Sequence, residues 1–120
     1  MNADLLFDCL ADPTRRRILA LLADQGELCV CELTAAVDDI QPKISRHLGV
    51  LKEAGIVVAR REATWMFYRP VAALPAWAAA ILAALPQSAG KQLRADLKRL
   101  KDMKGRPQRC ASLREERAAA

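Results

Sequence analysis

Apolar residues recur every three or four positions along most of the chain, which is the spacing expected of helices with one buried face. In residues 27–55 this pattern predicts two short helices joined by a turn. The second helix would have Pro42 in its first turn, where a missing N–H costs nothing, and Gly55 just past its last residue. Its buried stripe is expected to consist of Ile44, Leu48 and Leu51. The first helix is shorter and would end before Asp38.

Helices are also predicted on both sides of this pair. Apolar residues at positions 5, 6, 9 and 10 indicate a short first helix. Asp12 followed by Pro13 is a strong start signal for a second helix, which would end at residues 24–26. Its buried face is expected to consist of Ile18, Leu19, Leu21 and Leu22. Residues 93, 97 and 100 follow helical spacing again, and Gly105 and Pro107 would stop that last helix.

The second helix of the central pair carries its polar side chains in its first two turns, clear of the apolar stripe. Two helices with a tight turn and a polar start on the second are what a helix-turn-helix needs in order to place side chains in the major groove. Arg46 suits guanine, Gln41 suits adenine, and Lys43 suits a phosphate. An amphipathic hairpin with a merely solvated polar face is the alternative. The residues expected to contact DNA here are Gln41, Pro42, Lys43, Ser45, Arg46 and His47.

After Gly55 the pattern changes to that of strands. Two runs rich in β-branched and aromatic residues, 56–59 and 65–69, flank the polar residues 60–64 and predict an antiparallel hairpin. A basic hairpin directly after a reading helix is the wing of a winged helix. The residues expected to contact DNA from the wing are Arg60, Arg61, Thr64 and Arg69. Its aromatic side chains are expected to pack rather than to stack on bases.

A further helix should open at Pro75, with an apolar stripe of Trp77, Ile81, Leu82 and Leu85 among small residues. Small residues allow close helix approach, so this helix is a candidate dimer face as well as a core element. Residues 86–90 predict a break. The expected fold is therefore mainly α with a small β-hairpin, a homodimeric winged helix-turn-helix over residues 1–87. Residues 88–120 would form a basic C-terminal helix and a partly disordered tail.

Composition narrows the class of protein. The formal net charge is +5, and the basic residues are concentrated from the second helix of the pair onward, which suits a polyanion partner such as double-stranded DNA. A solvated basic tail would also explain residues 88–120. No apolar run is long enough to cross a membrane, and the N-terminus lacks a basic signal region, so a cytoplasmic location is expected. The chain lacks a Gly-rich phosphate loop and a Ser/His/Asp set, so it is not expected to be an enzyme.

Cys29 and Cys31 are the residues of the chain whose chemistry is most specific. Residues two apart point to nearly opposite sides of a helix, so both thiols could hold one ion only if Cys29 lies ahead of the helix or if the first turn unwinds. A soft, thiophilic ion bound there would distort the helix-turn-helix. Two buried cysteines and a redox-active pair are the alternatives, and the second would make the chain a thiol redox-sensing regulator.

Several of these motifs together resemble the ArsR family of winged-helix repressors, in particular the arsenic-resistance repressors. The resemblance covers residues 3–85. It is carried by the stretches Asp12–Leu19, Glu27–Leu33, Gln41–Leu48 and Trp65–Arg69, with Pro75–Ala78. It implies a homodimer on operator DNA that is released when arsenite As(III) or antimonite Sb(III) binds the thiolates of Cys29 and Cys31.

One position departs from the family pattern. Thr34 stands where the best-known members carry a third cysteine, and a hydroxyl is a poor ligand for a soft ion. The site would then be two-coordinate, or completed by an exogenous thiol, by Cys9 or by Cys110, and Cys110 in the basic tail is the candidate third ligand. The zinc sites of other family branches need His and carboxylate residues on the later helix, and residues 75–85 contain none.

Overall fold

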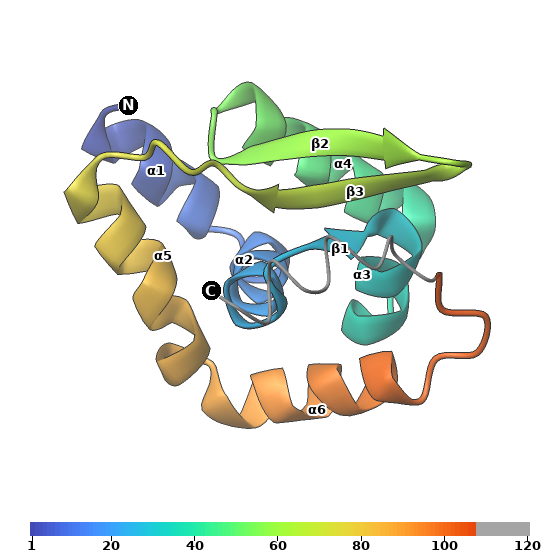
Figure 1. Ribbon diagram of the computed structural model, residues 1–120. Helices are drawn as coiled ribbons and strands as arrows, with labels where there is room; N and C mark the ends of the chain where they lie inside the picture. Colours follow the sequence, from blue (N-terminus) through green and yellow to red (C-terminus); the bar gives the residue numbers. More distant parts are fainter. Residues whose placement is uncertain (108–120) are drawn as a thin grey trace.

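The computed structural model describes residues 1–107, and Cys110 and the rest of 108–120 lie outside that range. Within it, helices surround one face of a small antiparallel sheet (Figure 1). The helices are α1 (Ala3–Leu10), α2 (Pro13–Gln25), α3 (Val30–Val37), α4 (Gln41–Glu53), α5 (Ala76–Ser88) and α6 (Gly90–Lys101). The strands are β1 (Leu28–Cys29), β2 (Val57–Glu62) and β3 (Trp65–Pro70).

Local capping explains where α2 begins and ends. The carboxylate of Asp12 accepts hydrogen bonds from the backbone N–H groups of Thr14 and Arg15 at 2.8 and 3.2 Å. Pro13 occupies the start of the helix, and Gly26 ends it with a φ of 86°. The middle of α2 is buried on several sides because it packs against α1, α3, α4, α5 and α6. The predicted start, end and core positions of this helix are confirmed.

The helix-turn-helix is formed by α3 and α4. Asp38 ends α3 in the left-handed conformation with a φ of 60°, and α4 starts three residues later. At the other end of α4, the N–H of Gly55 bonds to the carbonyl of Lys52 and the N–H of Ile56 bonds to that of Leu51, both at 3.0 Å. This is the pair of bonds by which a glycine closes a helix. Ile44, Leu48 and Leu51 are fully buried, as the periodicity predicts.

The predicted hairpin is present, and a third strand extends it. Glu62 pairs with Trp65 across a two-residue turn, in which Ala63 has a φ of 55°. β1 pairs with the other side of β3, so the strand order is β1-β3-β2 (Figure 1). Cys29 lies opposite Phe67 in this register. The junction before α3 is therefore paired with β3, the central strand of the sheet and one of the two strands of the wing. The sequence does not predict this link.

In the C-terminal half, one expectation is confirmed and two are corrected. The predicted break within 86–90 is confirmed but is confined to Ala89, because α5 runs through Pro86 to Ser88 and α6 begins at Gly90. The buried stripe of α5 includes Ala78 with Leu82 and Leu85, whereas Trp77 is 41% exposed. The expected boundary at residue 87 lies inside α5, and α6 shares the core through Leu93 and Leu100. Residues 3–101 thus pack as one unit in which α6 lies along α3 and α2.

Candidate nucleic-acid interface and thiol site

The N-terminal half of α4 exposes most of the side chains predicted to contact DNA. Gln41, Pro42, Ser45 and Arg46 are exposed, because the helix turns its apolar stripe inward. Lys43 is partly exposed, and its Nζ lies 2.9 Å from a carboxylate oxygen of Asp39. Hydrogen bonding from Lys43 is the main reason that the pKa of Asp39 is lowered. Besides Lys43, the start of α4 exposes the cation of Arg46, the amide of Gln41 and the hydroxyl of Ser45.

His47 does not lie on that exposed surface. Its side chain is buried against the start of α2, with Nε2 3.9 Å from an Asp12 oxygen and Nδ1 3.4 Å from an Arg15 nitrogen. Burial lowers the pKa of His47, so the ring is neutral at pH 7 and Nδ1 can accept from Arg15. The expectation that His47 contacts DNA is corrected, since the ring braces α4 against α2.

The arginines of the wing differ in their surroundings. Arg60 forms two hydrogen bonds with buried Glu27, at 2.8 and 2.7 Å, and its guanidinium lies 4.7 Å from the centre of the Phe67 ring. These contacts engage Arg60 within the protein and disfavour the expected contact with phosphate. Arg61, Thr64 and Arg69 are exposed. Because side chains alternate along a strand, the register puts Arg61 and Arg69 on opposite faces of the hairpin.

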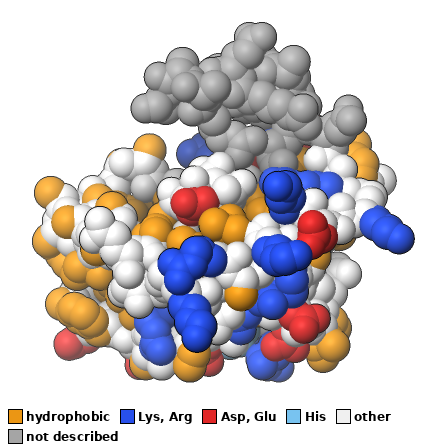
Figure 2. Space-filling view, turned by 90° about the horizontal axis from the view of Figure 1, so that it is seen from below, with side chains coloured by type: hydrophobic (Ala, Val, Ile, Leu, Met, Phe, Trp, Pro, Cys, Tyr) orange, Lys and Arg blue, Asp and Glu red, His pale blue; other side chains and the backbone are white. Residues whose placement is uncertain are grey.

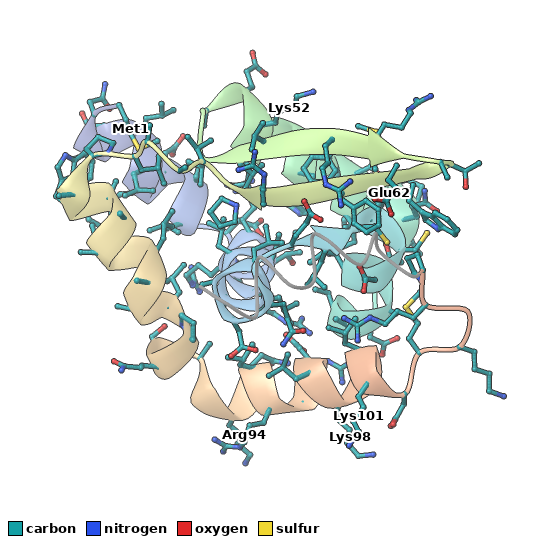
Figure 3. All side chains as sticks on the ribbon, viewed as in Figure 1. Met1, Lys52, Glu62, Arg94, Lys98 and Lys101 are labelled. Carbon is teal, nitrogen blue, oxygen red and sulfur yellow. The ribbon has the colours of Figure 1, made fainter. Side chains whose placement is uncertain are left out.

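A second basic surface lies on α6. Lys91, Arg94, Lys98 and Lys101 follow a spacing of three and four residues and form one stripe on the exposed side of the helix. Arg94, Lys98 and Lys101 point away from the rest of the molecule (Figure 3). Figure 2 views the molecule from this side and shows Lys and Arg side chains gathered across it. Part of the positive charge predicted downstream of the reading helix therefore lies on a separate element.

Cys29 occupies the junction between β1 and α3. It is the N-cap residue of α3, with an extended backbone, and its Sγ accepts the N–H of Glu32 at 3.4 Å. The Glu32 carboxylate in turn accepts the N–H of Cys29 at 2.9 Å. This reciprocal pair is a capping box in which a thiol stands where serine or threonine is usual. Cys29 is fully buried, and that burial raises the pKa of its thiol to about 12.

Cys31 lies in the first turn of α3 and is exposed, so the two thiols lie in different surroundings. Thr34 donates its hydroxyl hydrogen to the carbonyl of Val30 at 2.8 Å, which leaves it engaged in its own helix. Cys9 is buried in α1. Within residues 1–107, no cluster of three or more His, Cys, Asp or Glu side chains could hold a metal ion. Cys29 and Cys31 supply two soft donors, which fits a thiophilic ion held by two protein ligands.

Charged side chains that the sequence does not single out hold α3 in place. Glu32 is fully buried and pairs with Arg106, and Asp96 is 1% exposed and pairs with Arg17 and Arg99. The spacing of Cys29 and Glu32 is that of a capping box, and it could have marked Glu32. The partners of Asp96 include residues from distant parts of the chain, which leave no local signal. No helix within residues 1–107 has the length and apolar character needed to span a bilayer.

Sequence comparisons relate the chain to bacterial regulators. Residues 12–58 match the family described as "Bacterial regulatory protein, arsR family". The arsenic resistance transcriptional regulator ArsR1 of Pseudomonas putida is 48% identical over 108 residues, which covers 90% of this chain and 84% of that protein. The arsenical resistance operon repressor of Escherichia coli is 52% identical over 77 residues, covering 64% of this chain and 66% of the relative.

Solved structures agree with this relationship. The transcriptional repressor BigR from Xylella fastidiosa superposes with a TM-score of 0.60 at 36% identity, over 71% of this chain and 83% of BigR. The homodimeric winged helix-turn-helix DNA-binding domain Mb0332 from Mycobacterium bovis gives 0.60 at 33% identity, over 76% of this chain and 81% of that domain. The fold predicted from the sequence is thereby confirmed, and the chain belongs to the ArsR family of bacterial transcriptional regulators.

Proposed function

We propose that this protein is a homodimeric repressor of an arsenic-resistance operon, which leaves its operator when trivalent arsenic or antimony binds Cys29 and Cys31. The relatives in Pseudomonas putida and Escherichia coli are described as regulators of arsenic resistance, and they match most of the folded region. Trp77 on α5 and Phe7 on α1 are exposed apolar side chains and candidates for the dimer contact. A cytoplasmic location follows from action on the operator.

The DNA-reading role is assigned to the exposed start of α4. Arg46 would contact a guanine edge, Gln41 an adenine edge, and Ser45 a base or a phosphate. Lys43 would exchange its pairing with Asp39 for a phosphate. Arg61, Thr64 and Arg69 would contact the backbone from the wing. His47 and Arg60 are left out of the reading set, because their side chains are engaged within the protein.

The two thiols can bind a trivalent metalloid without any change of oxidation state. Each thiol that condenses with arsenous acid forms one S–As bond and breaks one As–O bond, and its proton leaves with the hydroxyl group as water. Arsenic stays trivalent. The raised pKa of Cys29 disfavours its thiolate, which attacks peroxide and also binds soft ions, so this shift does not separate the two signals. The relatives described as regulators of arsenic resistance favour the metalloid over the redox alternative.

The single observation that carries the proposal is the position of Cys29 between β1 and α3. Its sulfur caps the first helix of the helix-turn-helix, and its backbone pairs with Phe67 in the wing. A cysteine that binds an inducer in company with Cys31 must give up its cap to Glu32 and its buried position. Movement of Cys29 would then disturb both the helix-turn-helix and the wing. A coupling of about 1–3 kcal/mol between inducer and DNA would change operator affinity about 5- to 150-fold.

A mobility-shift titration tests the proposal. Purified protein should retard the DNA upstream of its own gene, and arsenite or antimonite should release that DNA under reducing conditions. Peroxide without a metalloid should have no such effect. Release by peroxide with reversal by a reductant, and no response to arsenite, would instead support the redox alternative.

Replacing Arg46 with alanine should weaken operator binding by about 1–3 kcal/mol, because a bidentate contact to guanine would be lost. Competition between operator and unrelated DNA at fixed salt measures this effect. Lys52 lies in the last turn of the same helix and is exposed, so Lys52→Ala is the matched control for removing one positive charge. Equal losses in the two variants would remove Arg46 from the reading set.

A further inference from the structure

Glu32 uses its two carboxylate oxygens in opposite directions. Oε1 accepts the backbone N–H of Cys29 at 2.9 Å, and Oε2 pairs with the guanidinium of Arg106. The Glu32 side chain is fully buried, whereas that of Arg106 is 35% exposed. Arg106 therefore extends from the surface to Glu32, the residue that forms the capping box with Cys29. A buried carboxylate needs such a partner, because an unpaired charge in the interior is costly.

The other end of α3 is held by the helices α2 and α6. Arg99 of α6 donates to the carbonyl of Ala36 at 2.8 Å, and Arg17 of α2 donates to that of Val37 at 3.0 Å. Both arginines also bind the carboxylate of Asp96, which α6 buries between them. The last carbonyls of a helix have no partner inside the helix, so these arginines take that place.

The chain from residue 90 to residue 107 thus contacts α3 at both ends. α6 packs along α3, and after residue 101 the chain rises beside α3 (Figure 1). We propose that residues 90–107 form a strap over α3, and that Arg106 is a positioning residue that keeps Cys29 capped and closed to ligands. The strap rests on the proposed function for its regulatory meaning, and on the contacts of Glu32 for its physical basis.

The strap has a definite thermodynamic consequence. Cys29 must leave its buried cap before its sulfur can bind a ligand from solution. A contact present only in the capped state opposes that opening, and its removal must raise the population of the open state. Arg106 therefore lowers the sensitivity of the repressor to its inducer.

Alkylation of the metal-free protein tests this directly. In a background of Cys31→Ser and Cys110→Ser, the remaining thiols are Cys9 and Cys29, both buried. Iodoacetamide should modify Cys29 about fivefold faster or more in Arg106→Gln than in the parent. The rate at Cys9, resolved by mass spectrometry of the peptides, should stay unchanged. Lys104→Gln removes one exposed charge from the same segment and is the matched control, and Arg106→Lys should restore most of the protection.

Titration with arsenite on the operator complex gives the second measurement, in protein with all four native cysteines. Arg106→Gln should be released at a lower arsenite concentration than wild type and Lys104→Gln, with operator affinity before arsenite equal to that of Lys104→Gln. Equal alkylation of Cys29 in Arg106→Gln and Lys104→Gln would overturn the strap. A parallel rise at Cys9 would also overturn it, because that pattern indicates general loosening. Failure of wild type to respond to arsenite would refute the proposed function, while the alkylation comparison would still decide on the strap.

Discussion

Serine at both Cys29 and Cys31 is expected to give a repressor that binds its operator normally and no longer responds to arsenite. The structure makes Cys29 the N-cap of α3, and serine is a better N-cap than cysteine. A serine oxygen can accept the N–H of Glu32 in place of the thiol, so the DNA-binding state should keep its stability. The soft donors are lost, however, and a hydroxyl does not replace them.

Mobility-shift titrations of operator DNA with arsenite measure this outcome. Wild type should lose affinity by about 5- to 150-fold, and the double variant should lose none. Cys9→Ser is the control, since it removes a buried thiol from α1 and leaves the junction before α3 intact. Release of the double variant by arsenite at the wild-type concentration would show that the thiol site has been assigned to the wrong residues.

The sequence predicts those elements whose signals are local. α2 and α4 have an apolar stripe, a proline near the start and a glycine soon after the end, and each signal acts within a few residues. The same periodicity puts Arg46 on the exposed side of α4. β1 escapes prediction because two residues cannot display an alternation, and it exists only through its pairing with β3.

The corrections concern side chains whose partners lie far away in the chain. The sequence pattern assigns His47 to the groove-facing set because it is polar and near the helix start. The ring is instead buried beside Asp12, the N-cap of α2, and Arg15 in the first turn of that helix. It assigns Arg60 to phosphate because this residue lies in a basic hairpin. In the structure Arg60 forms an ion pair with buried Glu27, whose charge needs a cation beside it. Trp77 shows the reverse error, since a large apolar residue at helical spacing is expected in the core and is exposed. In each case the local pattern does not show which distant part of the chain lies against the side chain.

Replacing Asp96 with asparagine is expected to destabilise the protein by about 3 kcal/mol, the largest change in stability anticipated for a single substitution outside the apolar core. Asparagine keeps the shape of the side chain but leaves Arg17 and Arg99 without the carboxylate that neutralises them. The value is at the lower end for a broken buried pair, because the two arginine side chains are 25% and 36% exposed.

Urea denaturation followed by circular dichroism measures the change in the free energy of unfolding. Asp102→Asn is the matched control, since that carboxylate follows α6 and pairs with Lys98 at 3.2 Å while 63% of its side chain is exposed. An exposed pair of this kind contributes less than about 1 kcal/mol. A loss in Asp96→Asn as small as the loss in the control would mean that α6 is held by its apolar contacts through Leu93 and Leu100 alone. The arginines that cap α3 would then act independently of Asp96, and the C-terminal hold on the helix-turn-helix would be weaker than its geometry indicates.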